Sequence, residues 1–101
     1  MGKLAKVAET SDIAPGQGKV VEVEGKTIAL FNVDGTFYAI DNTCLHRGGP
    51  LGEGELEGPV VTCPWHGWRY DVRTGTNAMN PSVKVQPYPT KVEGSAVFIE
   101  L

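Results

Sequence analysis

The sequence has few residues that ligate soft metals: two cysteines and two histidines among 101 residues. It also lacks an apolar run long enough to cross a membrane. Residues 1–9 contain an early glutamate instead of the apolar core of a signal peptide. We therefore expect a cytoplasmic protein without a membrane anchor. In that compartment two thiols are more often metal ligands or reduced cysteines than a disulfide.

Basic charge is also scarce, because the formal net charge is −3 at pH 7. Since a nucleic-acid-binding domain usually presents a basic face, we expect no nucleic-acid partner. No Gly-x-Gly-x-x-Gly pattern follows a predicted strand, which argues against a flavin or nicotinamide site. The length predicts one domain over residues 1–101, near the lower limit for a self-sufficient core. A cofactor that cross-links loops would stabilise a domain of this size.

Helical periodicity is absent as well. No segment repeats apolar residues with a period of about 3.6, so at most a short helical turn is expected. The 13 glycines and 7 prolines fall between short β-branched runs, which is typical of an all-β domain. Strands are expected at residues 4–8, 19–23, 26–33, 36–41, 60–62, 68–72, 83–92 and 96–100. Pro87 and Pro89 favour an edge position for the strand over 83–92.

Asp34-Gly35 is the strongest turn signal, since both central positions of a type I′ hairpin turn need positive φ. Glu24-Gly25 and Glu93-Gly94 have the same form, and these turns together favour an antiparallel sandwich or barrel. Along residues 26–33, positions 28 and 30 are expected on one face and positions 29 and 31 on the other. The acidic, glycine-punctuated interval 51–59 is predicted to consist of turns.

All cysteines and histidines lie in an excursion over roughly residues 43–71, as Cys44-x-His46 and Cys63-x-x-His66. Three interpretations are open. A tetrahedral zinc site is one, although zinc motifs favour pairs spaced by about two to four residues. Chance is the second, although two matching loops make coincidence a poor explanation. The third is a [2Fe–2S] cluster with two cysteines on one iron and two histidines on the other.

The residues between these ligands favour the cluster. Gly48, Gly49 and Gly67 permit close backbone approach, with N–H groups aimed at cluster sulfurs. Pro50 and Pro64 stiffen the two loops. The sequence therefore predicts two short, rigid loops that meet around a cofactor.

The segments Cys44-Leu45-His46-Arg47-Gly48 and Cys63-Pro64-Trp65-His66-Gly67-Trp68, with Tyr70-Asp71 and Gly75 after them, resemble the Rieske motif. The resemblance implies an all-β fold, a Rieske-type antiparallel β-sandwich with an inserted cluster-binding subdomain over roughly residues 43–71. It also implies one [2Fe–2S] cluster. In that family, the positions of Cys44 and Cys63 hold the inner iron, and those of His46 and His66 hold the outer iron.

High-potential members of this family have an extra cysteine in each loop and a serine after the second. Gly49, Trp65 and Trp68 stand in those places here. Because fewer donors reach the sulfurs, we expect a midpoint potential toward the low end of roughly −150 to +300 mV. Tyr70 works against this expectation, since it matches a tyrosine of the high-potential group.

The resemblance implies a Rieske-type ferredoxin, the electron-transfer component of a ring-hydroxylating dioxygenase system, and not an enzyme. Oxygen activation would need a second iron site with two further histidines and a carboxylate, and both histidines are already assigned. The implied partners are a flavoprotein NAD(P)H ferredoxin reductase and a terminal Rieske non-haem iron oxygenase of aromatic hydrocarbon catabolism. A monomer is expected. The alternative is a small Rieske subunit of a nitrite reductase or other oxidoreductase complex.

The surroundings of the ligands allow two further interpretations. The acidic residues are either a docking surface for a basic patch or a solvated loop; they are Asp41, Glu53, Glu55 and Glu57. Trp65 is expected as an exposed contact at the tip and Trp68 as a packing residue beneath it. Residues 77–81 are expected to form a third loop over the cluster, where Met79 shields sulfur or fills a gap.

Overall fold

The computed structural model describes residues 3–43, 49–65 and 67–100, and these residues form an all-β structure, as predicted. The strands are β1 Leu4–Glu9, β2 Gln17–Val23, β3 Lys26–Val33, β4 Thr36–Asp41, β5 Glu55–Glu57, β6 Val60–Thr62, β7 Arg69–Asp71, β8 Pro87–Tyr88, β9 Thr90–Glu93 and β10 Ala96–Glu100. Two single-turn 3-10 helices, η1 Thr10–Asp12 and η2 Leu51–Glu53, are the helical content of this part of the chain. None of its helices is long and apolar enough to cross a membrane.

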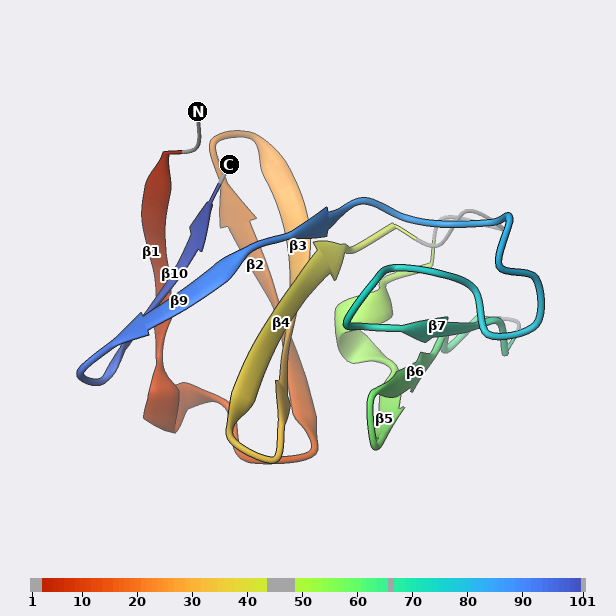
Figure 1. Ribbon diagram of the computed structural model, residues 1–101, viewed down its shortest axis with the longest axis horizontal. Helices are drawn as coiled ribbons and strands as arrows, with labels where there is room; N and C mark the ends of the chain where they lie inside the picture. Colours follow the sequence, from red (N-terminus) through yellow and green to blue (C-terminus); the bar gives the residue numbers. More distant parts are fainter. Residues whose placement is uncertain (1–2, 44–48, 66, 101) are drawn as a thin grey trace.

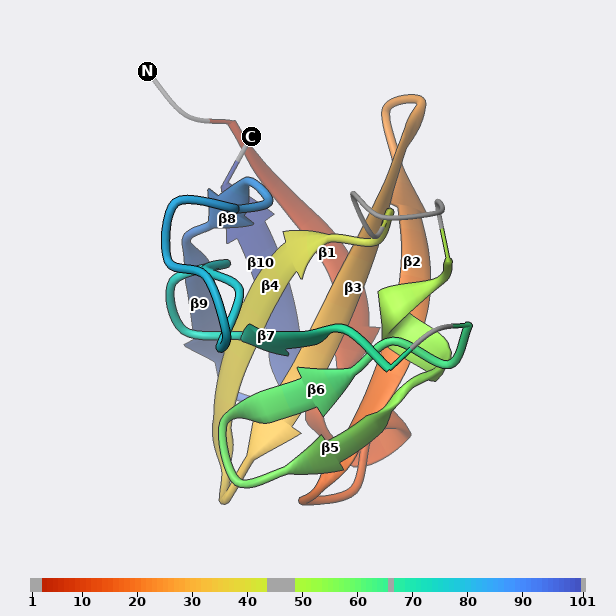
Figure 2. The same cartoon turned by 90° about the vertical axis from the view of Figure 1, so that its right-hand side faces the viewer.

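The strands form three antiparallel sheets with the orders β1-β10-β9, β2-β3-β4-β8 and β5-β6-β7. In Figure 1 the first two sheets make up the left-hand part of the molecule, and the third lies to their right. Figure 2, which looks from that side, shows β5, β6 and β7 in front of β3 and β4. The first and last strands pair with each other, with Leu4 opposite Glu100.

Strand β3 separates two hydrophobic cores, because both of its faces are buried. Ile28 and Leu30 point into one core and Ala29 and Phe31 into the other, as the alternation predicted. The distal core lies between the first two sheets and consists of Ala8, Ile13, Val21, Val23, Ile28, Leu30, Phe37, Ala39, Val97 and Ile99. The site-side core consists of Ala29, Phe31, Ile40, Leu51, Val61, Cys63, Tyr70, Val72 and Val85.

Two of the three predicted tight turns have the backbone geometry that their residues favour. At the third, Glu93 pairs with Ala96, so the turn residues are Gly94 and Ser95 instead of Glu93 and Gly94. Glu24 and Gly25 have φ values of 49° and 81°, and Asp34 and Gly35 have 51° and 94°. Positive φ at both central positions is the type I′ pattern, which matches the twist of the flanking strands. The side chain of Asn32 closes the second hairpin, since its Oδ1 accepts the Gly35 N–H at 2.7 Å.

Two strand predictions were wrong. Residues 55–57 form β5 instead of a turn, because pairing of Glu55 with Thr62 and of Glu57 with Val60 overrides their low strand propensity. The single strand predicted over 83–92 is divided into β8 and β9, which join different sheets. Pro87 and Pro89 lack the N–H that a continuous ladder needs. The edge assignment is confirmed, since β8 and β9 each lie at the edge of a sheet.

Candidate metal centre

The structure describes one of the four predicted ligands, Cys63. Cys44, His46 and His66 lie outside the described residues, as do Arg47 and Gly48. In the described ranges, no group of three or more His, Cys, Asp or Glu side chains is arranged to hold a metal ion. The centre is therefore built here from Cys63 and from the residues that bring the two motif segments together.

Strand β6 delivers Cys63, and the chain reverses directly into β7. The Cys63 N–H donates to the Trp68 carbonyl at 2.6 Å, and the Gly67 N–H donates to the Cys63 carbonyl at 3.1 Å. Gly67 has φ +77°, a conformation that L side chains rarely adopt. These two bonds and the glycine fix the start and the end of the second ligand loop.

Gly49, which follows the first motif segment, lies beside the thiol of Cys63 in the second segment. A Cβ atom at Gly49 would lie 2.7 Å from Cys63 Sγ and 3.1 Å from Cγ of Trp65. Cys63 itself is buried, with 3% of its surface exposed. Gly49 thus leaves open the space beside Sγ that a side chain would fill, as the close-approach prediction required. Positions 49 and 65 are occupied by glycine and tryptophan, so a disulfide between these positions, which would lock the two loops together, cannot form.

The two ends of the first motif segment are held side by side. Thr43 and Pro50 form an antiparallel bridge. Asn42, just before this bridge, accepts the Leu51 N–H on its carbonyl at 2.7 Å and the Gly52 N–H on Oδ1 at 2.8 Å. Sequence analysis did not select Asn42. The available signal was an asparagine directly before a cysteine motif, a residue type that often bonds nearby backbone.

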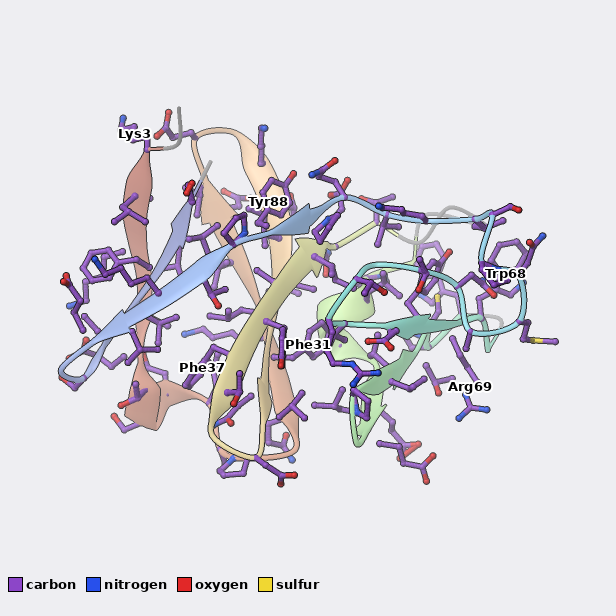
Figure 3. The ribbon with its side chains drawn as sticks, in the orientation of Figure 1. Lys3, Phe31, Phe37, Trp68, Arg69 and Tyr88 are labelled. Atoms are coloured by element: carbon purple, nitrogen blue, oxygen red, sulfur yellow. The ribbon has the colours of Figure 1, made fainter. Side chains whose placement is uncertain are left out.

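A third loop follows β7 and is shaped by another buried asparagine. Asn77 Oδ1 accepts the N–H groups of Met79 at 2.8 Å and Asn80 at 3.0 Å. These residues, with Trp68 and Val83, line a pocket of about 210 Å³. Figure 3 shows Trp68 at the far end of the β5-β6-β7 sheet from the first two sheets.

The aromatic residues of the second loop lie as predicted. Trp65 is 55% exposed, whereas Trp68 is half-buried and packs against the site-side core. Met79 is 81% exposed, so it fills no gap in the core. Tyr70 is fully buried in the same core as Cys63. The second loop therefore has an exposed indole at its tip, that of Trp65, and a buried thiol at its start, that of Cys63.

The acidic residues divide into two places. Glu53, Glu55 and Glu57 line a hollow of about 690 Å³ beside β2, together with Lys19. Asp41 does not line this hollow. It lies near Tyr88 instead: burial raises the pKa of Tyr88, and the negative charge of Asp41 raises it further. The predicted four-residue acidic surface is thus a group of three glutamates and a separate aspartate.

Asp71, at the end of the second motif, forms a fork with Arg73. Nε and Nη2 of Arg73 donate to the two carboxylate oxygens at 3.1 Å and 2.8 Å. The side-chain hydrogen bond from Arg73 is the main cause that lowers the pKa of Asp71. The carboxylate is therefore ionised at neutral pH. It helps to fix the turn after β7, because Oδ1 also accepts the Arg73 N–H at 2.9 Å.

A cluster with thiolate ligation fits these surroundings. A sulfur ligand at Cys63 would be buried and shielded from solvent, and Gly49 leaves room beside its Sγ. A closed apolar floor is provided by the site-side core. A buried thiolate such as that of Cys63 is the type of donor expected on the inner iron in mixed ligation.

The comparisons with known proteins agree with this site. A family model described as Rieske [2Fe-2S] domain matches residues 3–89. The ferredoxin component of the naphthalene 1,2-dioxygenase system of Pseudomonas putida is 40% identical over 100 residues, which cover 98% of this chain and 96% of the relative.

Two solved structures show the same fold. A chain in the complex of reduced oxygenase and oxidized ferredoxin of carbazole 1,9a-dioxygenase superposes with a TM-score of 0.87 and 35% identity, covering 95% of this chain and 91% of that chain. A protein provisionally assigned as the small subunit of an NADH-dependent nitrite reductase from Mycobacterium tuberculosis gives 0.93 at 22% identity, covering 100% and 96%. Fold, motif and relatives lead to one conclusion: this chain belongs to the Rieske [2Fe–2S] domain family.

Proposed function

We propose that this protein is a Rieske-type ferredoxin, a one-electron carrier from a flavoprotein NAD(P)H reductase to a terminal aromatic-ring-hydroxylating oxygenase. The observation that carries the proposal is the likeness, over 98% of the chain, to a protein named as the ferredoxin component of a dioxygenase system. A second relative of known structure was solved in a complex described as oxygenase and ferredoxin. The protein is a component of such a system and is not an enzyme by itself.

The proposed ligands are Cys44 and Cys63 on the inner iron and His46 and His66 on the outer iron. When bound, the [2Fe–2S] cluster supplies a centre that accepts and releases one electron. The chain supplies the surroundings: Gly49 leaves space beside Cys63 Sγ, and the second loop is closed by the bond from Cys63 N–H to the Trp68 carbonyl. With Gly49 and Trp65 in place of cysteines, no disulfide draws the two loops together, which supports the expectation of a low potential.

The proposal extends to organisation and location. Residues 1–101 form one domain, in which the insert over roughly residues 43–71 holds the cluster. The protein acts as a cytoplasmic monomer. A carrier that visits two partners in turn gains from small size and transient binding, since exchange between partners depends on rapid dissociation.

The decisive experiment combines spectroscopy with reconstitution. EPR of the dithionite-reduced protein should show one [2Fe–2S] centre with mixed Cys/His ligation. With a ferredoxin reductase and an oxygenase of this class, NADH-dependent product formation should require this protein. A signal of four-cysteine ligation or a colourless protein would refute the cofactor assignment. A correct signal without electron delivery to any such oxygenase would refute the proposed pathway alone.

The second candidate is a Rieske subunit of a nitrite reductase or similar complex. It is favoured by one observation, the TM-score of 0.93 to the M. tuberculosis protein, and at 22% identity that likeness concerns the fold. Co-purification separates the two candidates. A subunit remains in a stable stoichiometric complex with a larger chain, whereas a carrier elutes alone as a monomer.

A further inference from the structure

We propose that Asn42 is a positioning residue for the first cluster loop, and that its bonds to η2 set the separation of the loop's two ends. The proposal rests on the proposed function in one respect, the assignment of Cys44 and His46 as ligands. Asn42 lies two residues before Cys44, and its bonding partners lie directly after Pro50. It is 7% exposed, so its hydrogen bonds are shielded from water.

The short helix η2 cannot satisfy its own first N–H groups. Its N-cap is Pro50, which makes no side-chain capping bond. The first N–H groups of any helix lack partners within the helix. Asn42 supplies both, since its backbone carbonyl accepts the Leu51 N–H and its Oδ1 accepts the Gly52 N–H. The next two N–H groups, of Glu53 and Gly54, bond to the carbonyls of Pro50 and Leu51 within the turn.

Packing shows that this contact is specific. A Cβ at Gly52 would lie 3.0 Å from Asn42 Oδ1 and 2.6 Å from Cγ2 of Val20, so only glycine admits the amide and β2 together. Leu51 is fully buried in the site-side core that also contains Cys63. Asn42 therefore connects the end of the first loop, through Leu51, to the site-side core that lies beneath the second loop.

The same residue is anchored to the main sheet on its other side. The Asn42 N–H donates to the Thr27 carbonyl at 3.2 Å, and the Asp41 N–H donates to the Gln86 carbonyl at 2.8 Å. The entry to the loop is thereby fixed by β3 and by the segment before β8, while its exit is fixed by Asn42 together with the Thr43–Pro50 bridge. A buried N–H that loses its acceptor is destabilising, so removal of Oδ1 should open the loop ends.

Asn32 is a matched control. It is 4% exposed, and its Oδ1 also accepts a backbone N–H, from Gly35. Its Nδ2 donates to the Ile13 carbonyl in the distal core at 2.8 Å. Loss of either asparagine amide should therefore lower the stability of the protein, but only the Asn42 amide lies beside the cluster loop.

The experiment compares Asn42→Leu, Asn42→Asp and Asn32→Leu as holoproteins. Asn42→Leu should release iron to a chelator roughly tenfold faster than wild type, the effect of about 1.4 kcal/mol on local opening, and should change the EPR g-values. Asn42→Asp keeps the Oδ1 acceptor and should restore slow release. Asn32→Leu should release iron within about twofold of wild type with an unchanged spectrum, because its amide is remote from the loop.

Two results would overturn the inference: release and spectrum of Asn42→Leu equal to those of Asn32→Leu, or release from Asn42→Asp as fast as from Asn42→Leu. If Asn42→Leu does not fold, Asn42→Ala, which also lacks a side-chain acceptor, replaces it with the same expectations. A wild-type spectrum without mixed Cys/His ligation would instead refute the ligand assignment. If the wild-type spectrum shows mixed Cys/His ligation but the Asn42 variants have no effect, the positioning role alone is refuted.

Discussion

The two faces of β3 border regions that are stabilised in different ways. On one face, the distal core joins β1, β2, β4 and β10, which are five to seven residues long, and its members are all hydrocarbon side chains. On the other, the site-side core relies on β5, β6 and β7, each three residues long, and includes a thiol and a phenol. Long paired strands thus stabilise one half, and short strands with loops stabilise the other.

The difference has a physical reason. A three-stranded sheet with three residues per strand has few ladder bonds, so it needs further cross-links to pay for its ordering. Side-chain to backbone bonds from Asn42 and Asn77 supply some of these. The proposed cluster, bound through both loops, would supply the strongest. The region proposed to hold the cluster would therefore be the region whose stability depends on that cofactor.

Cys63→Ser should have the largest effect. Removal of one proposed thiolate ligand should abolish the cluster's EPR signal and leave the site-side sheet without its main cross-link. Hydrogen exchange should then accelerate strongly at β5, β6 and β7 and much less at β3 and β10, because local opening follows local stability. Equal acceleration in both halves would contradict the comparison between the two cores.

Truncation of one leucine in each core is the next test. Leu30 and Leu51 are both fully buried, in the distal and the site-side core respectively. Leu30→Ala and Leu51→Ala should each lower the free energy of unfolding by about 2–5 kcal/mol. Only Leu51→Ala should also speed iron release, measured by loss of visible absorbance with a chelator. Faster release from Leu30→Ala would show that the cores are not independent.

Two glycines allow a sharper test within the site-side core. A Cβ at Gly49 would lie 2.7 Å from Cys63 Sγ, and one at Gly18 would lie 2.6 Å from Cδ1 of Phe31. Both alanine variants should lose about 1–3 kcal/mol of stability through overpacking. The midpoint potential should shift in Gly49→Ala and stay unchanged in Gly18→Ala. Voltammetry of the two holoproteins measures this, and equal potentials would refute a role for the Gly49 contact.

The smallest effect concerns pH. The pKa of Asp71 is lowered from 3.8, chiefly by its side-chain bond to Arg73. A lowered pKa in the folded state contributes stability above the unfolded value, and this contribution is lost as pH falls through the folded value. Arg73→Gln should therefore be less stable than wild type above about pH 5, and the difference should vanish in stronger acid.

Thermal unfolding across the acid range measures this difference. Lys91→Gln is the control, since Lys91 pairs with Glu93 at 3.4 Å between two exposed side chains in the first sheet. Exposed pairs of this kind contribute little. A pH-independent difference between Arg73→Gln and wild type would show that Arg73 acts by packing and not through the Asp71 charge.

Each half was predicted in part from sequence. β6 of the third sheet has its predicted bounds, and the strand predicted over 83–92 is divided between the first two sheets. The bounds of β3, β4 and β10 agree with the prediction, because alternation and acidic-glycine turns specify register locally. Strand β5 was not predicted, since Glu55-Leu56-Glu57 has one apolar residue and becomes a strand through pairing with β6. Its pattern contains no signal for that long-range choice.

The candidate site was predicted in its chemistry but not in its supports. The Cys-His motif predicts the ligands, and this stays a prediction, since of the four the described residues include Cys63 alone. Gly49 follows its prediction of close approach. Asn42 and Asn77 were missed, because a capping asparagine is recognisable only when the segment whose N–H groups it accepts is known. For Asn42 that segment is the single-turn helix η2, and for Asn77 it is a loop. Neither is long enough to show a periodicity from which its position could be predicted.

The pairing of Leu4 with Glu100 has a practical consequence for attachment. Figure 1 shows the start of β1 and the end of β10 at the upper left, away from the β5-β6-β7 sheet. A surface linker or a fused protein joined at either end would therefore leave the loop-bearing end facing outward. Immobilised on an electrode in this way, the protein would present the proposed cluster end to a dissolved partner.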